Sequence, residues 1–165
     1  MQTFLPFFNF KRTARLLDSK RLNKQIVEAY QILTDRVPNL NHPAYLMWKN
    51  SKGTLQKYIL VCCNEYTLRF NKVHSIYSKM TKKYIDKCDF QKYNLLFLSH
   101  KVNLLRKDYE YYFSLEKYLE FDLKKYPEGY FWPICKGKVS AKHTKAWVDF
   151  SKEKNEKFQI YNIFG

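Results

Sequence analysis

The residues of this chain whose types and spacing could do chemistry lie in the stretch LDSKRLNKQIVEAYQIL, from Leu17 to Leu33. In a helix, Arg21, Lys24 and Glu28 would lie on one face, because residues three and four apart are neighbours on a helical surface. A single carboxylate among cations is held in its charged form. Such a group could stabilise positive charge developing on a substrate, or transfer protons. The alternative is an ordinary Lys24–Glu28 surface pair, worth a few tenths of a kcal/mol.

A helix from Asp18 to about Arg36 is predicted to position these side chains. Asp18 is a favourable N-cap, and Leu17 and Leu22 have the spacing of a hydrophobic staple. Pro38 follows the predicted end. The apolar face, expected to meet the core, consists of Leu22, Ile26, Ala29, Tyr30 and Leu33. The outward polar face is expected to consist of Arg21, Lys24, Gln25, Glu28 and Gln31.

The remaining elements are also predicted to be helical, with irregular connections. The aromatic residues 1–10 should pack on the core, and a second polar face should follow Ser99 in the stretch SHKVNLLRKDYEYYF. That face would present His100, Asn103, Arg106 and Lys107. The other predicted helices run from Asn41-His42-Pro43 through Trp48, from a Ser51 cap to about Asn71, and, more weakly, over His74–Lys87.

The predicted fold class is therefore all-α, a compact single-domain helical fold with long irregular connections. No convincing pair of strands with period-two alternation is present. We expect one domain over residues 1–165, with residues 134–165 forming a basic C-terminal extension. The apolar residues near the C-terminus could form a docked segment or a short strand.

The charge of the chain favours a polyanionic partner. Thirty basic residues against fifteen acidic ones give a formal net charge of +15, which attracts nucleic acid first and anionic membrane second. No apolar run is long enough for a membrane span, and the N-terminus lacks a signal-peptide pattern, so an intracellular, non-secreted protein without a membrane partner is expected. The cysteines, Cys62, Cys63, Cys88 and Cys135, are predicted to be core thiols rather than metal ligands.

Several other chemistries find no support in the sequence. It contains no HExxH, no paired-cysteine zinc motif, no GxSxG and no glycine-rich phosphate loop, so we expect no metal and no cofactor. A basic surface rich in aromatic residues remains. Such a surface can bind phosphates and stack on bases.

Five blocks of the sequence, taken together, resemble the pyrimidine dimer DNA glycosylase family, the group that includes phage T4 endonuclease V and bacterial homologues. They keep the order found in the bacterial members and span residues 1 to about 133. The blocks are MQTFLPF, ARLLDSKRLNKQIVEAYQIL, NHPAYLMWK, LSHKVNLLRKDYEYY and YFWP.

The resemblance implies a T4 endonuclease V-like fold and a metal-independent glycosylase with AP-lyase activity on damaged double-stranded DNA. The family uses its N-terminal α-amine as the nucleophile and the glutamate of its first long helix as the catalytic carboxylate. Here these correspond to Met1 and Glu28. Arg21 stands where the family has a histidine, and Val27 and Gln31 stand where it has arginines. Because Gln2 is bulky, Met1 is expected to be retained.

The remaining site residues are expected to shape the pocket or hold phosphates, and no obligate protein partner is predicted. These residues are Arg21, Lys24, Gln25, His42, His100, Asn103, Arg106 and Lys107. Two alternatives stay open at this point. The first is a non-catalytic nucleic-acid-binding protein on the same scaffold. The second is a related glycosylase acting on another modified base, or on RNA.

Overall fold

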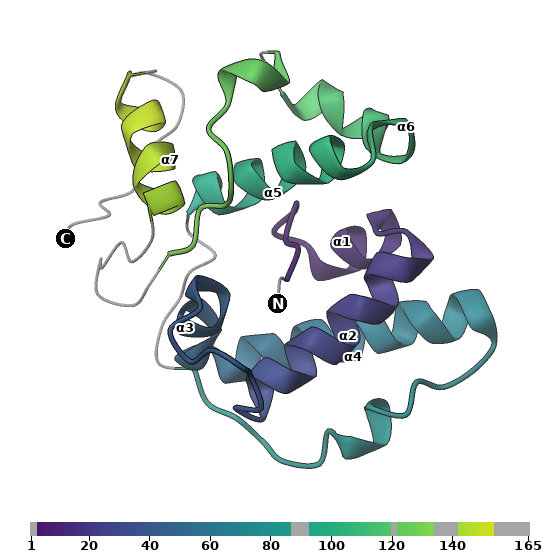
Figure 1. Ribbon diagram of the computed structural model, residues 1–165. Coiled ribbons are helices and arrows are strands. Elements are labelled where there is room, and N and C mark those ends of the chain that lie inside the picture. Colours follow the sequence, from purple (N-terminus) through teal and green to yellow (C-terminus); the bar gives the residue numbers. More distant parts are fainter. Residues whose placement is uncertain (1–2, 87–92, 120–121, 134–141, 154–165) are drawn as a thin grey trace. The chain divides into compact units, whose positions relative to one another are not determined.

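The computed structural model describes residues 3–86, 93–119, 122–133 and 142–153, and these residues form helices joined by irregular segments (Figure 1). No strand occurs among them, which confirms the predicted all-α class. The chain divides into two compact units, residues 1–89 and residues 90–165. The predicted single domain with an extension from residue 134 stays a prediction.

The first unit is built around two long helices that pack on each other, α2 (Ser19–Leu33) and α4 (Lys52–Phe70). Figure 1 shows α4 running along α2. Two shorter helices, α1 (Phe10–Leu16) and α3 (Pro43–Lys49), also pack against α4. The unit ends with the 3-10 turn η1 (Tyr77–Lys79).

The start of α2 is set by the local signals that the sequence contains. The Asp18 carboxylate accepts from the backbone N–H of Arg21 at 2.9 Å, which confirms the predicted N-cap. Leu17 and Leu22 are both completely buried, as a staple requires. The predicted end near Arg36 is wrong, because the helix ends at Leu33 and Asp35 takes a left-handed conformation with φ of 58°.

Other predictions for this unit had mixed outcomes. The helices through Trp48 and from Ser51 are confirmed, and Pro43 occupies the first turn of α3, where its missing N–H costs nothing. The weak helix predicted over His74–Lys87 is wrong for its described part, since within residues 74–86 only the three-residue turn η1 forms. Residues 3–7 are buried as expected.

Helix α1 was not predicted, although Asn9 is a favourable N-cap. The Asn9 side chain accepts from the backbone N–H of Arg12 at 3.0 Å. At the other end, the Arg69 guanidinium of α4 donates to the carbonyl oxygens of Ala14, Arg15 and Leu17 at 2.6 to 3.0 Å. These are carbonyls that a helix end leaves without an intrahelical partner. Both ends of this short helix are therefore fixed by side chains.

The second unit contains α5 (Asn94–Lys107), α6 (Tyr109–Tyr112) and α7 (Lys142–Glu153), with the 3-10 turns η2 (Phe113–Tyr118) and η3 (Leu123–Lys125). The prediction that Ser99 caps a helix is wrong, because α5 begins five residues earlier. Ser99 is buried inside it, and its Oγ accepts from the backbone N–H of Phe131 at 3.0 Å. The predicted helix is also interrupted at Asp108, whose side chain caps α6.

Two of the cysteines are core thiols, as predicted. Cys62 and Cys63 are buried and not disulfide-bonded, and burial raises the pKa of both, that of Cys63 to about 12. Cys88, Cys135 and the apolar residues near the C-terminus lie outside the described residues. Among the described residues, no helix combines the length and the apolar character that crossing a membrane would need.

Candidate active site

A buried hydrogen-bond cluster in the first unit fixes the N-terminal segment against three helices. The backbone N–H of Phe4 donates to Oε1 of Gln25 on α2 at 2.6 Å. The Tyr58 hydroxyl of α4 donates to the Phe4 carbonyl at 2.8 Å and lies 3.2 Å from the same Gln25 oxygen. The Trp48 indole N–H of α3 donates to Oγ1 of Thr3 at 2.7 Å. Residues 3 and 4 are thus held in one place from α2, α3 and α4.

The cluster corrects the prediction for Gln25. This side chain was assigned to the outward face of its helix, but the residue is only 1% exposed. A buried amide needs hydrogen-bond partners, and here the N-terminal segment and Tyr58 supply them. Gln25 therefore positions the N-terminal segment instead of facing solvent or substrate directly.

Glu28 lies one turn further along α2, on a partly covered face. Its side chain is 12% exposed, and its carboxylate oxygen is 3.7 Å from the Lys24 ammonium, which is itself 66% exposed. Arg21 is also on this helix, with its guanidinium paired to the Asp18 carboxylate at 2.6 Å. The predicted Lys24–Glu28 pair is present, but its acidic member is largely shielded from water.

His42 brings a third titratable group into the electrostatic environment of Glu28. It is the N-cap of α3, where its Nδ1 accepts from the backbone N–H of Ala44 at 3.2 Å. Burial lowers its pKa, the charge of the N-terminal amine lowers it further, and the Glu28 carboxylate acts in the opposite direction. The ring is therefore neutral at pH 7. Because Nδ1 accepts, the ring proton is on Nε2.

This arrangement could assist a reaction in which positive charge develops on the substrate. A shielded carboxylate can stabilise a developing cation more strongly than one in open water, because the effective dielectric is lower. A neutral imidazole with Nε2–H can donate a hydrogen bond. Within the described residues, no group of histidine, cysteine, aspartate and glutamate side chains is arranged to hold a metal ion.

The site residues predicted on α5 fall in the second unit, and two of them are buried rather than outward-facing. His100 is completely buried, with its ring edge-on to those of Tyr130 and Trp132 at 5.1 and 4.9 Å between centroids. Burial lowers its pKa to about 3. Asn103 is 8% exposed and donates to the carbonyls of Ser99 and Gly129. Both side chains hold the segment 129–132 in place.

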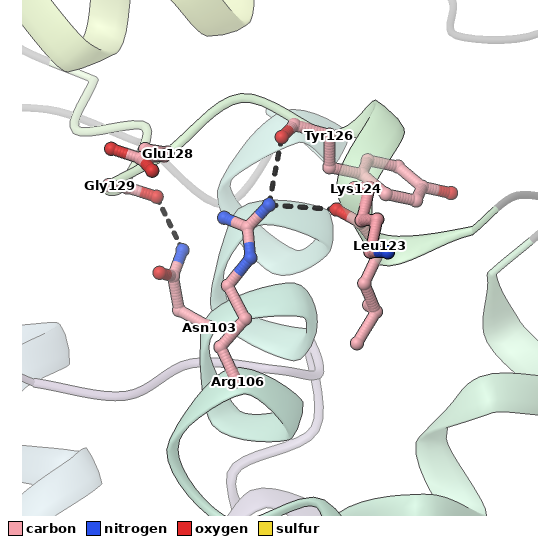
Figure 2. Close-up of a pocket in the computed structure, with 7 residues that line it drawn as sticks. All are labelled: Asn103, Arg106, Leu123, Lys124, Tyr126, Glu128 and Gly129. Carbon is pink, nitrogen blue, oxygen red and sulfur yellow. Dashed lines mark hydrogen bonds between the residues drawn. The ribbon is translucent and has the colours of Figure 1, made fainter.

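Arg106 and Asn103 also line a pocket of about 620 Å³ in this unit (Figure 2). The Arg106 guanidinium donates to the carbonyls of Leu123, Tyr126 and Pro127 at 2.8 to 2.9 Å. Most of its donors are therefore already hydrogen-bonded to the backbone of the protein. The pocket's other charged residues have opposite signs, Lys124 and Glu128. This balance does not favour phosphate, and Lys107 is simply exposed.

The part of the chain that resembles a known family lies within the first unit. Residues 1–78 match the model of the family described as pyrimidine dimer DNA glycosylase. The match covers the first 78 of the 165 residues, and over this part the chain is similar to that family. No curated protein and no solved structure gave a match.

The extent of the match favours the Glu28 region over the α5 pocket. It includes the N-terminal segment, Gln25, Glu28 and His42, and all of α1 to α4. The matched family is described as a DNA glycosylase. Of the residues predicted for the site, the structure brings Arg21, Lys24, Gln25, Glu28 and His42 together in this unit and leaves those of α5 in the other.

Sequence reasoning missed Thr3, Trp48 and Tyr58, which anchor the N-terminal segment. No local sequence signal identifies them, because each of their partners lies 33 to 54 residues away along the chain. The N-cap role of His42 could have been found, since a proline at the first helical position is a start signal for a helix.

Replacing Gln25 with leucine should release the N-terminal segment. The Phe4 N–H would remain buried without its acceptor, which costs about 1–3 kcal/mol of unfolding free energy. Amide hydrogen exchange should accelerate at Phe4, and urea unfolding should report the loss. The control is Gln31→Leu, an exposed position on the same helix. Equal effects of the two substitutions would show that Gln25 does not hold the segment.

Replacing His100 with phenylalanine should reduce the loss of unfolding free energy that accompanies a fall in pH below 6.5. The pKa of His100 falls from 6.5 to about 3 on folding, so below pH 6.5 only the unfolded chain binds its proton. Stability should therefore fall with decreasing pH by about 1.4 kcal/mol per unit between these values, and His100→Phe should remove this contribution. Denaturant titrations at pH 4.5, 5.5 and 6.5 measure it. The control is His74→Phe, because His74 is less buried. If the unfolding free energies of wild type and His100→Phe changed in parallel with pH, the low pKa of His100 would be contradicted.

Proposed function

We propose that this chain excises cyclobutane pyrimidine dimers from double-stranded DNA and then cleaves the backbone, with the α-amine of Met1 as nucleophile. One observation carries the proposal. The segment that leads to the amine is anchored by Phe4 and Thr3 in the interior of the first unit, and its main anchor, Gln25, is on the helix that bears Glu28.

Covalent geometry supports the proximity that this reaction needs. Three residues of extended chain span at most about 11 Å, which limits the distance from the amine of residue 1 to the fixed nitrogen of Phe4. Residues three apart on a helix have Cβ atoms about 5–6 Å apart, so Glu28 and Gln25 are neighbours. His42 also senses the charges of both the amine and Glu28.

The chemistry follows from these groups. The neutral amine attacks C1′ of the damaged nucleotide, the bond from C1′ to the base breaks, and the base leaves with the bonding electron pair. Loss of the ring oxygen from C1′ then gives an iminium. Glu28 would stabilise the positive charge on the sugar and assist the proton transfer from C2′ that expels the 3′ phosphate. Water finally hydrolyses the iminium and regenerates the amine.

The surroundings of the site suit an amine that must lose its proton. An α-amine ordinarily has a pKa of about 7.7–8.0, and nearby cations lower that pKa. We assign this effect on the amine to Arg21 and Lys24 of α2. Lys24, being mostly exposed, is also positioned to contact phosphate, and we assign the same role to exposed Lys107 on α5.

Glu28→Gln should abolish strand cleavage while DNA binding is retained. The substitution preserves shape but removes the charge that stabilises the sugar cation, which should cost about 10²- to 10³-fold in rate. Gel assays on a duplex with one cyclobutane dimer measure cleavage, and fluorescence anisotropy measures binding. Glu65→Gln is a matched control, because Glu65 is 14% exposed and ion-paired to Arg69 four residues later. Cleavage at the wild-type rate by Glu28→Gln would remove this carboxylate from the mechanism.

Met1 should be present in the mature protein. A bulky second residue, Gln2, blocks removal of the initiator, and loss of Met1 would leave a glutamine able to cyclise and so lose its amine. Intact-mass spectrometry of untagged protein should give the mass of the full sequence. A mass lower by one methionine would contradict the proposed nucleophile.

A further inference from the structure

A lysine-rich segment follows α4 and returns along the first unit. We refer to residues 71–86 as the basic segment. It begins at the C-terminal end of α4 and ends beside the N-terminal end of the same helix (Figure 1). Its lysines, Lys72, Lys79, Lys82 and Lys83, are all exposed, and its single acidic residue is Asp86. The segment therefore presents a dense positive charge.

The start of the basic segment is held by His74. Its Nδ1 accepts from the backbone N–H of Ile76 at 3.1 Å, so the ring proton is on Nε2, which donates to Oδ1 of Asn23 on α2 at 3.2 Å. The ring also lies edge-on to that of Tyr66 on α4, with 5.0 Å between the centroids. Ile76 itself is 7% exposed. The first part of the segment is thus fixed to both long helices.

The end of the basic segment is held by the N-terminal part of α4. The Gln56 side chain donates to the Lys82 carbonyl at 2.7 Å. The Asp86 carboxylate accepts from the backbone N–H and the hydroxyl of Thr54 at 2.9 and 2.6 Å. It thereby binds an N–H that the start of a helix leaves without an intrahelical partner. The lysines are therefore carried on a backbone that is fixed at both ends, which lowers the conformational entropy lost on binding a ligand.

No acidic side chain in this part of the chain is paired with these lysines. All acidic residues of the stretch 1–86 have other partners. Asp18 pairs with Arg21, Glu28 with Lys24, Asp35 with Lys52 and Glu65 with Arg69, while Asp86 is bound to Thr54. Within residues 3–86, the positive charge of the basic segment is therefore uncompensated by ion pairs, and such a patch attracts polyanions.

The basic segment borders the exposed face of α2. It contacts this helix at Asn23 and at Tyr30, where the Lys79 ammonium lies 6.0 Å from the centre of the ring. At 3.6 residues per turn, both contact positions are about 140–160° around the helix from Glu28. Exposed Lys24 lies on the face between them. The carboxylate proposed to act on the sugar and the basic segment are therefore on opposite sides of one exposed helical surface.

We propose that the basic segment binds phosphates of a duplex that lies across α2, about three to five nucleotides from the nucleotide at Glu28. The inference rests on the proposed function and adds a contact surface for its DNA substrate. A helix with its side chains is about 10–12 Å wide, and one strand of a duplex carries a phosphate about every 3.4 Å along the axis. The width of α2 thus corresponds to at least about three nucleotides, and the lysines of the basic segment lie beyond it.

The test is the salt dependence of DNA binding, with cleavage suppressed by Glu28→Gln in every protein compared. Each phosphate contact contributes about 0.9 to the slope of log K against log salt concentration. Replacing Lys79, Lys82 and Lys83 together by glutamine should therefore reduce the slope by about 2 to 3, and should weaken binding by about tenfold or more at about 0.1 M salt. Fluorescence anisotropy on a duplex with one cyclobutane dimer measures both. Arginine at the same three positions should retain the slope of Glu28→Gln alone.

The matched control removes the same charge from the second unit. Lys125, Lys145 and Lys152 are exposed there, and their joint replacement by glutamine should change the slope by less than about one. Equal slopes for the two triple variants, or an unchanged slope after replacement of the lysines of the basic segment, would overturn the inference.

Neutral methylphosphonate linkages locate the contact and separate this inference from the proposed function. A neutral linkage about three to five nucleotides from the dimer should weaken binding severalfold, and should have little further effect on the protein that lacks the three lysines. Independent effects of linkage and substitution at every position would contradict the proposed surface. Failure of the wild-type protein to cleave any dimer duplex would instead overturn the proposed function, while the salt slope on undamaged duplex would still decide the role of the basic segment.

Discussion

The hydrogen bond from the Phe4 N–H to Oε1 of Gln25 is the constraint on which the first unit depends. A backbone N–H that is buried must find an acceptor, and this one finds it on the helix that also carries Glu28. Tyr58 and Trp48 complete the anchorage from two further helices. The core therefore fixes residues 3 and 4 relative to the helix that carries the carboxylate. In a glycosylase whose nucleophile is its own terminus, that relation would determine the reaction.

Local signals predicted much of this architecture. The Asp18 cap, the Leu17–Leu22 staple and Pro43 at the start of α3 each act over a few residues, and each formed as expected. The end of α2 could not be placed in this way, because Asp35 adopts a left-handed conformation that is uncommon for residues other than glycine. Likewise, the early start of α5 could not be predicted, because no side chain caps the helix there.

The wrong predictions of side-chain exposure at the site share one physical cause. Helical periodicity assigns polar residues to the outward face, yet Gln25, His100 and Asn103 are buried. Their partners come from distant parts of the chain, and a single sequence does not contain those pairings. Glu28, in contrast, was singled out by its helical spacing from Arg21 and Lys24 and then by the family resemblance, and the family match covers it. Its role remains a proposal.

The net charge overstates the number of cations available to DNA. The guanidinium groups of Arg69 and Arg106 each donate to three backbone carbonyls, so both act as braces of the fold. The planar fork of arginine suits this use, since it offers several donors in fixed directions. The cations that remain exposed on α1 and α2, among them Lys11, Arg15 and Lys24, are better placed to serve the substrate.

Borohydride trapping of the untagged protein tests the central claim most directly. The substrates are a duplex with one cyclobutane dimer and an otherwise identical duplex with one abasic site. The account predicts a covalent adduct on both, with peptide mapping placing the DNA on the α-amine of Met1. An adduct on a lysine side chain, or no adduct on either duplex, would contradict it.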